Sequence, residues 1–123
     1  MTMPWGGMAN YSATKVANVN LAVSLSKSLS GTGITSNAVS PGMILTAGME
    51  EWLRGMAPKL GLPADDMAAM EEFAVKNMVP NPSARIGRVE DIAHAVAFLA
   101  SPLAGYINGA NIRVDGGSVP TIS

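Results

Sequence analysis

Two short runs of residues that favour extended backbone restrict the fold of this chain more than any other feature. They lie at 34–40 and 111–114, and each ends in turn residues, a Pro-Gly pair after the first and Asp-Gly-Gly after the second. Runs bounded in this way are typical of strands. The stretch between them has helical patterns, and strands joined through helices form right-handed parallel crossovers. The pattern predicts an α/β fold with two short parallel strands.

About four helices are expected to accompany these strands. A long helix is predicted over 13–30, because Leu21, Leu25 and Leu29 recur at i, i+4 and i+8. Its apolar arc is wider than the stripe of a surface helix, which indicates a helix that is covered on two sides. Prolines divide the stretch 46–77 into two further helical pieces, and another helix precedes the second strand.

A sheet of two strands leaves both of its outer edges open to pairing. Parallel sheets are normally covered on both faces within a larger sheet. Charged residues make up 14% of the chain, a low share for a small domain surrounded by water, although an ordinary, slightly apolar domain could have it too. We therefore expect the sheet to be completed by oligomerisation or by a partner chain.

Composition argues against several classes of function. The formal net charge is −1 and no basic run is present, so nucleic-acid binding has no electrostatic basis. The chain has no cysteine and one histidine, so neither a disulfide nor a zinc site is expected, and the metal prediction is none. No apolar stretch approaches the roughly 20 residues of a membrane span, and no signal peptide is recognisable. The expected location is the cytoplasm, without a membrane partner.

Tyr11 and Lys15 are the residues with the clearest chemical potential. They are four residues apart near the expected start of the long helix, which places them on one helix face. A phenol has a pKa near ~10, and a nearby ammonium lowers it by favouring the phenolate. Such a pair can give a proton to a carbonyl oxygen or take one from an alcohol. By itself, the pair is also explained by an aromatic ring at a helix end beside a solvated lysine.

The context of this pair is more specific than the pair alone. Five blocks occur in order, at 11–15, 37–46, 85–93, 98–101 and 109–117. In residue types, order and spacing, the blocks resemble the short-chain dehydrogenase/reductase family over nearly the whole chain. The resemblance implies a partial Rossmann-like (doubly wound) unit, equivalent to the C-terminal half of that fold. It also implies NAD(P)-dependent hydride transfer between a carbonyl and an alcohol.

The same resemblance suggests how the chain is organised, as a single domain over 1–123. The expected parts are a loop at 1–10, the catalytic helix, strand and Pro-Gly turn at 11–46, substrate-loop helices at 47–82, and the last helix and strand at 83–123. Methionines in the substrate-loop helices would suit an apolar substrate, because methionine adapts its shape, but core packing explains them equally well.

The family's catalytic residues map onto the Tyr-Lys pair. Tyr11 resembles the catalytic acid/base, and Lys15 resembles the partner that lowers its pKa and binds the cofactor ribose. The resemblance implies that both contact the cofactor, expected to be NAD or NADP, beside a small carbonyl or alcohol substrate. His94, Arg85 and Arg88 are expected to be structural or surface residues.

Four further positions resemble the family's nicotinamide-binding segment. Pro41 and Gly42 look like the turn that lies against the nicotinamide ring. Ile44 would offer backbone groups to the carboxamide, and Thr46 would bond to the carboxamide or to a phosphate. Without their neighbours, Pro41 and Gly42 indicate only a turn.

Several of the family's features have no match in this sequence. A dinucleotide fold holds pyrophosphate at a Gly-rich turn between a strand and a helix, whereas Gly31 and Gly33 follow a helix. The family's Asn-Asn-Ala-Gly block and the catalytic serine that precedes the tyrosine are not found. We therefore expect the isolated chain to be inactive alone, and to act with a complementary N-terminal half or as a homo-oligomer.

Two other hypotheses remain open. The chain could be a non-catalytic assembly module that self-associates through its sheet edge and its long helix. It could also be a remnant of a longer polypeptide with no role of its own. The residues that decide between NAD and NADP follow strands of the family fold that have no counterpart here.

Overall fold

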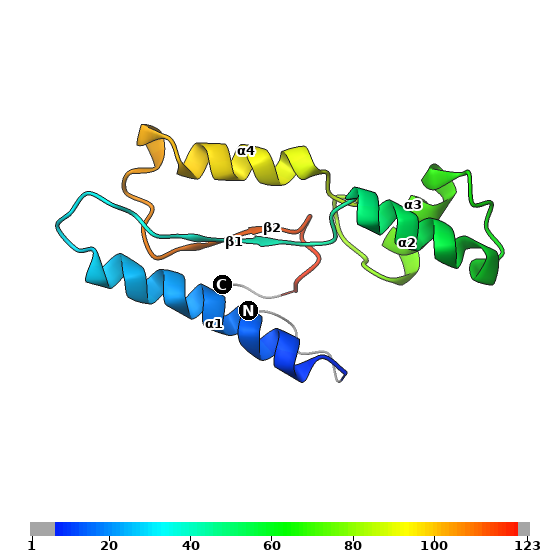
Figure 1. The fold of residues 1–123 in the computed structure, drawn as a ribbon. Coiled ribbons are helices and arrows are strands. Elements are labelled where there is room, and N and C mark those ends of the chain that lie inside the picture. Colours follow the sequence, from blue (N-terminus) through cyan, green and yellow to red (C-terminus); the bar gives the residue numbers. More distant parts are fainter. Residues whose placement is uncertain (1–6, 121–123) are drawn as a thin grey trace. The chain divides into compact units, whose positions relative to one another are not determined.

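A computed structural model describes residues 7–120 of the chain. Its elements, in chain order, are α1 (Ala9–Ser28), β1 (Ala38–Pro41), α2 (Ala47–Met56), the short 3-10 helix η1 (Ala57–Leu60), α3 (Met67–Asn77), α4 (Val89–Leu99), the 3-10 helix η2 (Pro102–Ala104) and β2 (Asn111–Val114) (Figure 1). These elements form two compact units. The first contains the described parts of Met1–Ser40 and His94–Arg113, and the second contains Pro41–Ala93 and Val114–Pro120.

The two strands pair in parallel. The amide of Ala38 donates to the carbonyl of Ala110 at 2.8 Å, and the amide of Gly42 donates to the carbonyl of Val114 at 2.9 Å. Because the residue number rises by the same amount on both strands between these bonds, the strands run in the same direction. Four α-helices and two parallel strands confirm the predicted α/β fold and its partial Rossmann-like character.

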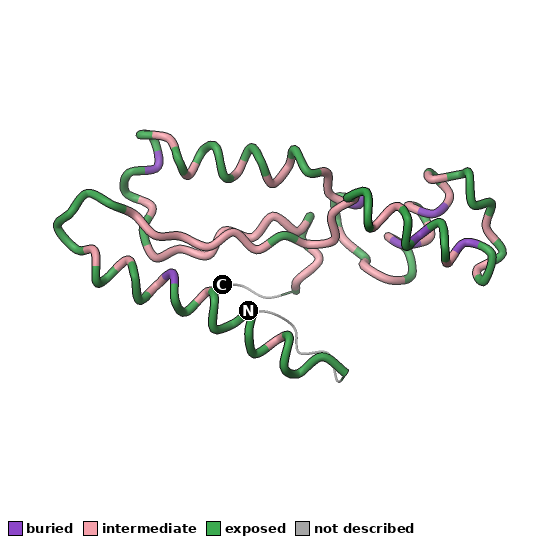
Figure 2. The backbone as a smooth tube through the Cα atoms, viewed as in Figure 1, coloured by how far each residue is buried: buried purple, intermediate pink, exposed green. Residues whose placement is uncertain are grey.

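The first unit has a layered arrangement. The strands lie between α1 on one side and the His94–Leu99 part of α4 on the other (Figure 1). Helices on both faces of a parallel sheet are the mark of a doubly wound fold. Among its described residues, only Ala22 and Ala104 are buried, whereas Leu21 is 56% exposed and Leu25 is 44% exposed. The tube in Figure 2 shows α1 exposed along most of its length.

The second unit has a hydrophobic core of its own. Its buried members are Leu53, Ala57, Met70, Ala74 and Ile86. Methionines and aliphatic residues of the same unit pack against this cluster; they are Met43, Leu45, Met49, Leu62, Met67, Val75 and Met78. Met49, Met67, Met70 and Met78 of the predicted substrate-loop segment therefore supply core packing, which is one of the two roles considered for its methionines.

Helices α2 and α3 of this unit each begin at a residue whose short polar side chain accepts a hydrogen bond from a helix amide. Asp66 accepts from the amide of Ala69 at 2.9 Å and caps α3. A 3-10 turn separates the helices, with a proline in its first turn and Gly61 in the left-handed region at its end. The division of 46–77 into two helical pieces is confirmed.

Two boundaries differ from the sequence-based expectation. Helix α1 begins at Ala9, so the last residues of the expected 1–10 loop are helical, while residues 1–6 lie outside the described chain. The helix starts early because the amide of Ser12 already donates to the carbonyl of Met8. Strand β1 is shorter than 34–40 because side chains take over the bonds before it: the amide of Ser36 donates to the side chain of Asn108.

Candidate functional site

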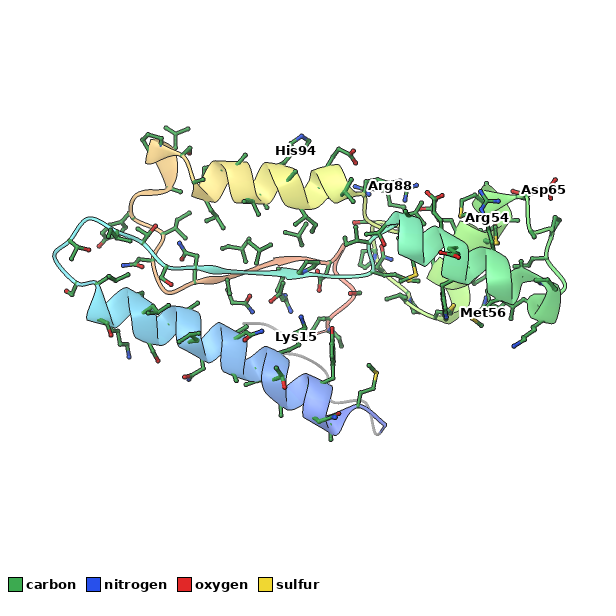
Figure 3. All side chains as sticks on the ribbon, viewed as in Figure 1. Lys15, Arg54, Met56, Asp65, Arg88 and His94 are labelled. Atoms are coloured by element: carbon green, nitrogen blue, oxygen red, sulfur yellow. The ribbon has the colours of Figure 1, made fainter. Side chains whose placement is uncertain are left out.

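Tyr11 and Lys15 lie together on the first turns of α1. The Lys15 Nζ atom is 5.4 Å from the centroid of the Tyr11 ring, within the range of a cation–π interaction. The predicted face-sharing of the pair is therefore observed. Tyr11 is 54% exposed, so its ring is accessible from solvent. Lys15 is labelled in Figure 3.

Local hydrogen bonds stabilise the helix start that carries this pair. The side chain of Asn10 accepts from the amide of Tyr11 at 2.9 Å. The Thr14 hydroxyl donates to the carbonyl of Asn10, also at 2.9 Å. Both bonds are made to Asn10 in the first turn of α1, and they involve neither the Tyr11 hydroxyl nor the Lys15 ammonium. The geometry allows both groups to act on a molecule that approaches the exposed side of α1.

Pro41 and Gly42 occupy the end of β1 and the residue after it. A Cβ atom on Gly42 would lie 2.7 Å from Cα and 3.0 Å from Cβ of Asp115. Contacts this short with a backbone atom leave no room for a side chain, so glycine is required for the approach of the two segments. The side chain of Asp115 in turn accepts from the amides of Gly117 and Val119. Packing against Asp115, within the second unit, thus fixes the position of the Pro-Gly turn.

Ile44 sits in a short parallel bridge with Gly87. The amide of Gly87 donates to the carbonyl of Met43 at 2.9 Å, and the amide of Leu45 donates to the carbonyl of Gly87 at 2.8 Å. The two bonds engage the residues on either side of Ile44, so the Ile44 amide takes part in neither of them. The family resemblance assigns backbone groups of Ile44 to the nicotinamide carboxamide. The Ile44 carbonyl already accepts from the amide of Thr46 at 3.0 Å.

Thr46 is the N-cap of α2. Its Oγ1 atom accepts from the amide of Met49 at 3.2 Å, while its backbone is extended. The hydroxyl hydrogen of a threonine that accepts in this way remains able to donate. A structural role for Thr46 is therefore evident, and it is compatible with a contact to a ligand.

The six predicted positions fall into two groups. Tyr11 and Lys15 belong to the first unit, where the structure brings them together. The remaining positions, from Pro41 to Thr46, belong to the second unit, where they form one continuous segment.

A network around Glu71 is the main feature of the second unit that sequence analysis missed. The Glu71 carboxylate accepts from both terminal nitrogens of Arg88, at 2.9 and 2.7 Å, and from the amide of Ile86 at 2.8 Å. The hydrogen bonds from Arg88 lower the pKa of Glu71, and partial burial opposes this effect. Since the partners are far apart in sequence, no local pattern reveals the network.

Arg85 and Arg88 have the fold-stabilising role expected of them. Arg85 donates to both carboxylate oxygens of Asp91, at 2.7 and 2.9 Å. The same carboxylate accepts from the amide of Arg88, the residue before α4, at 2.7 Å. An acidic side chain in the first turn that accepts the amide preceding the helix is half of a capping box. The Arg-Ile-Gly-Arg block therefore anchors the start of α4.

The structure also shows the surroundings of Asn37 and His94. Asn37 donates to the carbonyl of Ile107 and accepts from the amide of Ala110, so it ties the start of β1 to the segment before β2. His94 is exposed on α4 and is labelled in Figure 3.

Within residues 7–120, no three His, Asp or Glu side chains gather as metal ligands would. Over the same part of the chain, no helix combines the length and the apolar character that a membrane crossing requires.

Comparison with known proteins extends this picture. A profile of the family described as Enoyl-(Acyl carrier protein) reductase matches residues 1–119. The uncharacterized oxidoreductase YvaG of Bacillus subtilis (strain 168) is 41% identical over 120 residues, which are 98% of this chain and 45% of YvaG. The 3-oxoacyl-(acyl-carrier-protein) reductase FabG of Escherichia coli (strain K12) is 38% identical over 116 residues, which are 94% of this chain and 41% of FabG.

Solved structures show the same relationship. YwfH, an NADPH-dependent reductase involved in bacilysin biosynthesis, superposes with a TM-score of 0.78 and 31% identity over 97% of this chain and 43% of YwfH. L-sorbose reductase from Gluconobacter frateurii, complexed with NADPH and L-sorbose, has a TM-score of 0.79 and 26% identity over 91% of this chain and 41% of that protein. The chain thus spans less than half the length of each of these proteins.

Proposed function

Because the chain belongs to the short-chain dehydrogenase/reductase family, we propose that it contributes the acid/base pair and the nicotinamide-side segment of an NAD(P)-dependent carbonyl reductase or alcohol dehydrogenase. The observation that carries the proposal is the position of Lys15 Nζ, 5.4 Å from the centre of the Tyr11 ring, on an exposed helix start. The proposed substrate is a small carbonyl compound or the corresponding alcohol.

The available donors fit a nicotinamide nucleotide. The Ile44 amide and the Thr46 hydroxyl are donors that suit an amide oxygen or a phosphate oxygen. Lys15 offers an ammonium that suits ribose hydroxyls. A bound nicotinamide nucleotide would supply the hydride. The absence of a side chain at Gly42 lets the Pro-Gly turn pack against Asp115.

Tyr11 performs the proton transfer in this proposal. In the reducing direction, the carbonyl carbon gains a hydride and its π electrons move to the oxygen, which then takes the proton of the Tyr11 hydroxyl. The phenolate left behind lies beside the ammonium of Lys15. In the oxidising direction, the phenolate takes the alcohol proton as the carbon loses its hydride. Proton transfer from a positioned side chain typically contributes about 10²–10⁴-fold to the rate.

A partner is part of the proposal. The first unit carries exposed apolar side chains on α1 and on its part of α4, with Val16 51% exposed and Val96 48% exposed. A two-stranded parallel sheet between such helices leaves pairing edges open. We propose that a complementary N-terminal segment, of the kind that makes up the rest of the relatives' length, or further copies of this chain cover these surfaces. The proposed setting is the cytoplasm.

Reconstitution tests this function. The chain would be combined with the N-terminal segment of YvaG, and the consumption of NADH or NADPH would be followed with simple ketones. The expected result is ketone-dependent oxidation of one nucleotide by the mixture, and none by either part alone. Persistent absence of turnover, despite a stable complex between the two parts, would remove the proposal.

The exposed Leu21–Leu25 side of α1 favours a second candidate function, a self-associating module without catalysis. Residues at i and i+4 lie on one face, and such an apolar stripe can pair two helices. Calorimetric titration with NADH and NADPH separates the candidates. Micromolar binding by a defined complex supports the enzyme, whereas stable self-association without nucleotide binding in any combination supports the module.

A further inference from the structure

Gly87 lies against the segment that is proposed to hold the nicotinamide. Its amide donates to the Met43 carbonyl at 2.9 Å, and its carbonyl accepts from the Leu45 amide at 2.8 Å. These two bonds fix the backbone immediately before and after Ile44. Gly87 therefore restrains the backbone on both sides of Ile44.

A side chain at Gly87 would press on the end of the Ile44 side chain and on the Met43 carbonyl. A Cβ atom there would lie 2.6 Å from Cδ1 of Ile44 and 3.3 Å from the Met43 carbonyl oxygen. The φ angle of Gly87 is not positive, so the backbone itself would accept another residue. Glycine at this position is thus favoured by the contacts with Ile44 and Met43 and not by backbone conformation.

The segment around Gly87 is held firmly from its other side. Ile86 is 2% exposed within the core of the second unit, and its amide donates to the Glu71 carboxylate at 2.8 Å. The amide of Arg88 donates to Asp91 at 2.7 Å. Because the residues on both sides of Gly87 are anchored, an added Cβ would displace Ile44 in preference to Gly87.

We infer that Gly87 is a positioning residue that aims the backbone amide of Ile44 at the nicotinamide carboxamide. This inference rests on the proposed function and deepens it, since it assigns a cofactor-related role to a residue outside the predicted cofactor-binding positions. The Ile44 side chain connects a change at position 87 to the Ile44 backbone. Its Cδ1 atom is the first atom that a larger residue at position 87 would meet.

A rescue experiment in the reconstituted enzyme tests the inference. The variants are Gly87→Ala, Ile44→Val and the double variant, in which valine removes the Cδ1 atom that the added Cβ would strike. The dissociation constant for NADH or NADPH is measured by fluorescence, alongside KM and kcat. Gly87→Ala is expected to weaken nucleotide binding by about tenfold. It should raise the KM for the nucleotide by a larger factor than it lowers kcat. The double variant is expected to bind within about twofold of the wild type.

The outcomes separate the inference from the proposed function. A wild-type assembly that binds neither nucleotide overturns the proposed function, and this inference falls with it. If the wild type binds and Gly87→Ala binds equally well, the inference alone is wrong. A folded double variant whose affinity stays about tenfold below the wild type also overturns it, even where the single variant fails to fold.

Discussion

The carboxylate of Glu71 on α3 and the guanidinium of Arg88 before α4 form a two-point ion pair, with hydrogen bonds of 2.9 and 2.7 Å. The pair joins the predicted substrate-loop helices to the Arg-Ile-Gly-Arg block. The block in turn contacts the nicotinamide-side segment through Gly87 and Ile44. A continuous set of short contacts therefore connects α3 to the segment that is proposed to bind the cofactor.

Replacing Glu71 by glutamine is expected to destabilise the second unit by about 1 kcal/mol. The amide keeps an acceptor for the Ile86 amide but loses the charge that favours Arg88, and the partial exposure of the Arg88 side chain, at 41%, limits the effect. Urea unfolding of the chain at neutral pH measures the change. The matched control is Glu72→Gln at the exposed neighbouring position, which should unfold like the wild type. Equal stability of both variants would contradict this account of the ion pair.

The same carboxylate predicts how stability depends on pH. The hydrogen bonds from Arg88 lower the pKa of Glu71 below its ordinary value of 4.5. A group with a lowered pKa in the folded state stabilises the fold above its unfolded pKa, and this contribution is lost as the pH falls through the folded pKa. The wild type should therefore lose stability below pH 4.5 more steeply than Glu71→Gln. Parallel curves for the two proteins in a series of urea unfolding measurements across acid pH would be inconsistent with the prediction.

Several of these features were predictable from sequence because their causes are local. The cap at Asp66, the break between α2 and α3, and the shared face of Tyr11 and Lys15 each depend on residues within one helical turn. The contact between Glu71 and Arg88 depends on how α3 folds back, which no short pattern encodes. For the same reason, the sequence indicated a turn at Gly42 but not its contact with Asp115.

Gly42 and Gly48 offer a matched pair of substitutions. Alanine at position 42 would place its Cβ 2.7 Å from the Asp115 α-carbon, whereas a Cβ at position 48 meets nothing within 4 Å. Gly42→Ala should therefore cost about 1–3 kcal/mol in the free energy of unfolding. Gly48→Ala, which lies in α2, should be neutral or stabilise by up to about 1 kcal/mol. Similar unfolding midpoints for the two variants would show that the two strand-end segments do not pack as described.

Thr46 and Asp66 can separate helix capping from cofactor binding. Each accepts one helix amide, from Met49 and Ala69 respectively, so replacing either by alanine should cost about 1 kcal/mol of stability. Only Thr46→Ala should also weaken nucleotide binding in the reconstituted enzyme, and Thr46→Ser should preserve both properties. If Asp66→Ala weakens the binding of NADH or NADPH to the same extent, the role of Thr46 is limited to capping.

The most direct measurement is the turnover of the reconstituted enzyme with Tyr11→Phe, accompanied by its affinity for the nucleotide. Phenylalanine keeps the ring beside Lys15 but removes the proton that the proposed reaction needs, so turnover should fall by about 10²-fold or more while nucleotide binding is retained. Tyr106→Phe, at the fully exposed second tyrosine of the chain, should leave both quantities unchanged. Turnover of Tyr11→Phe at the wild-type rate would contradict the assignment of Tyr11 as the acid/base.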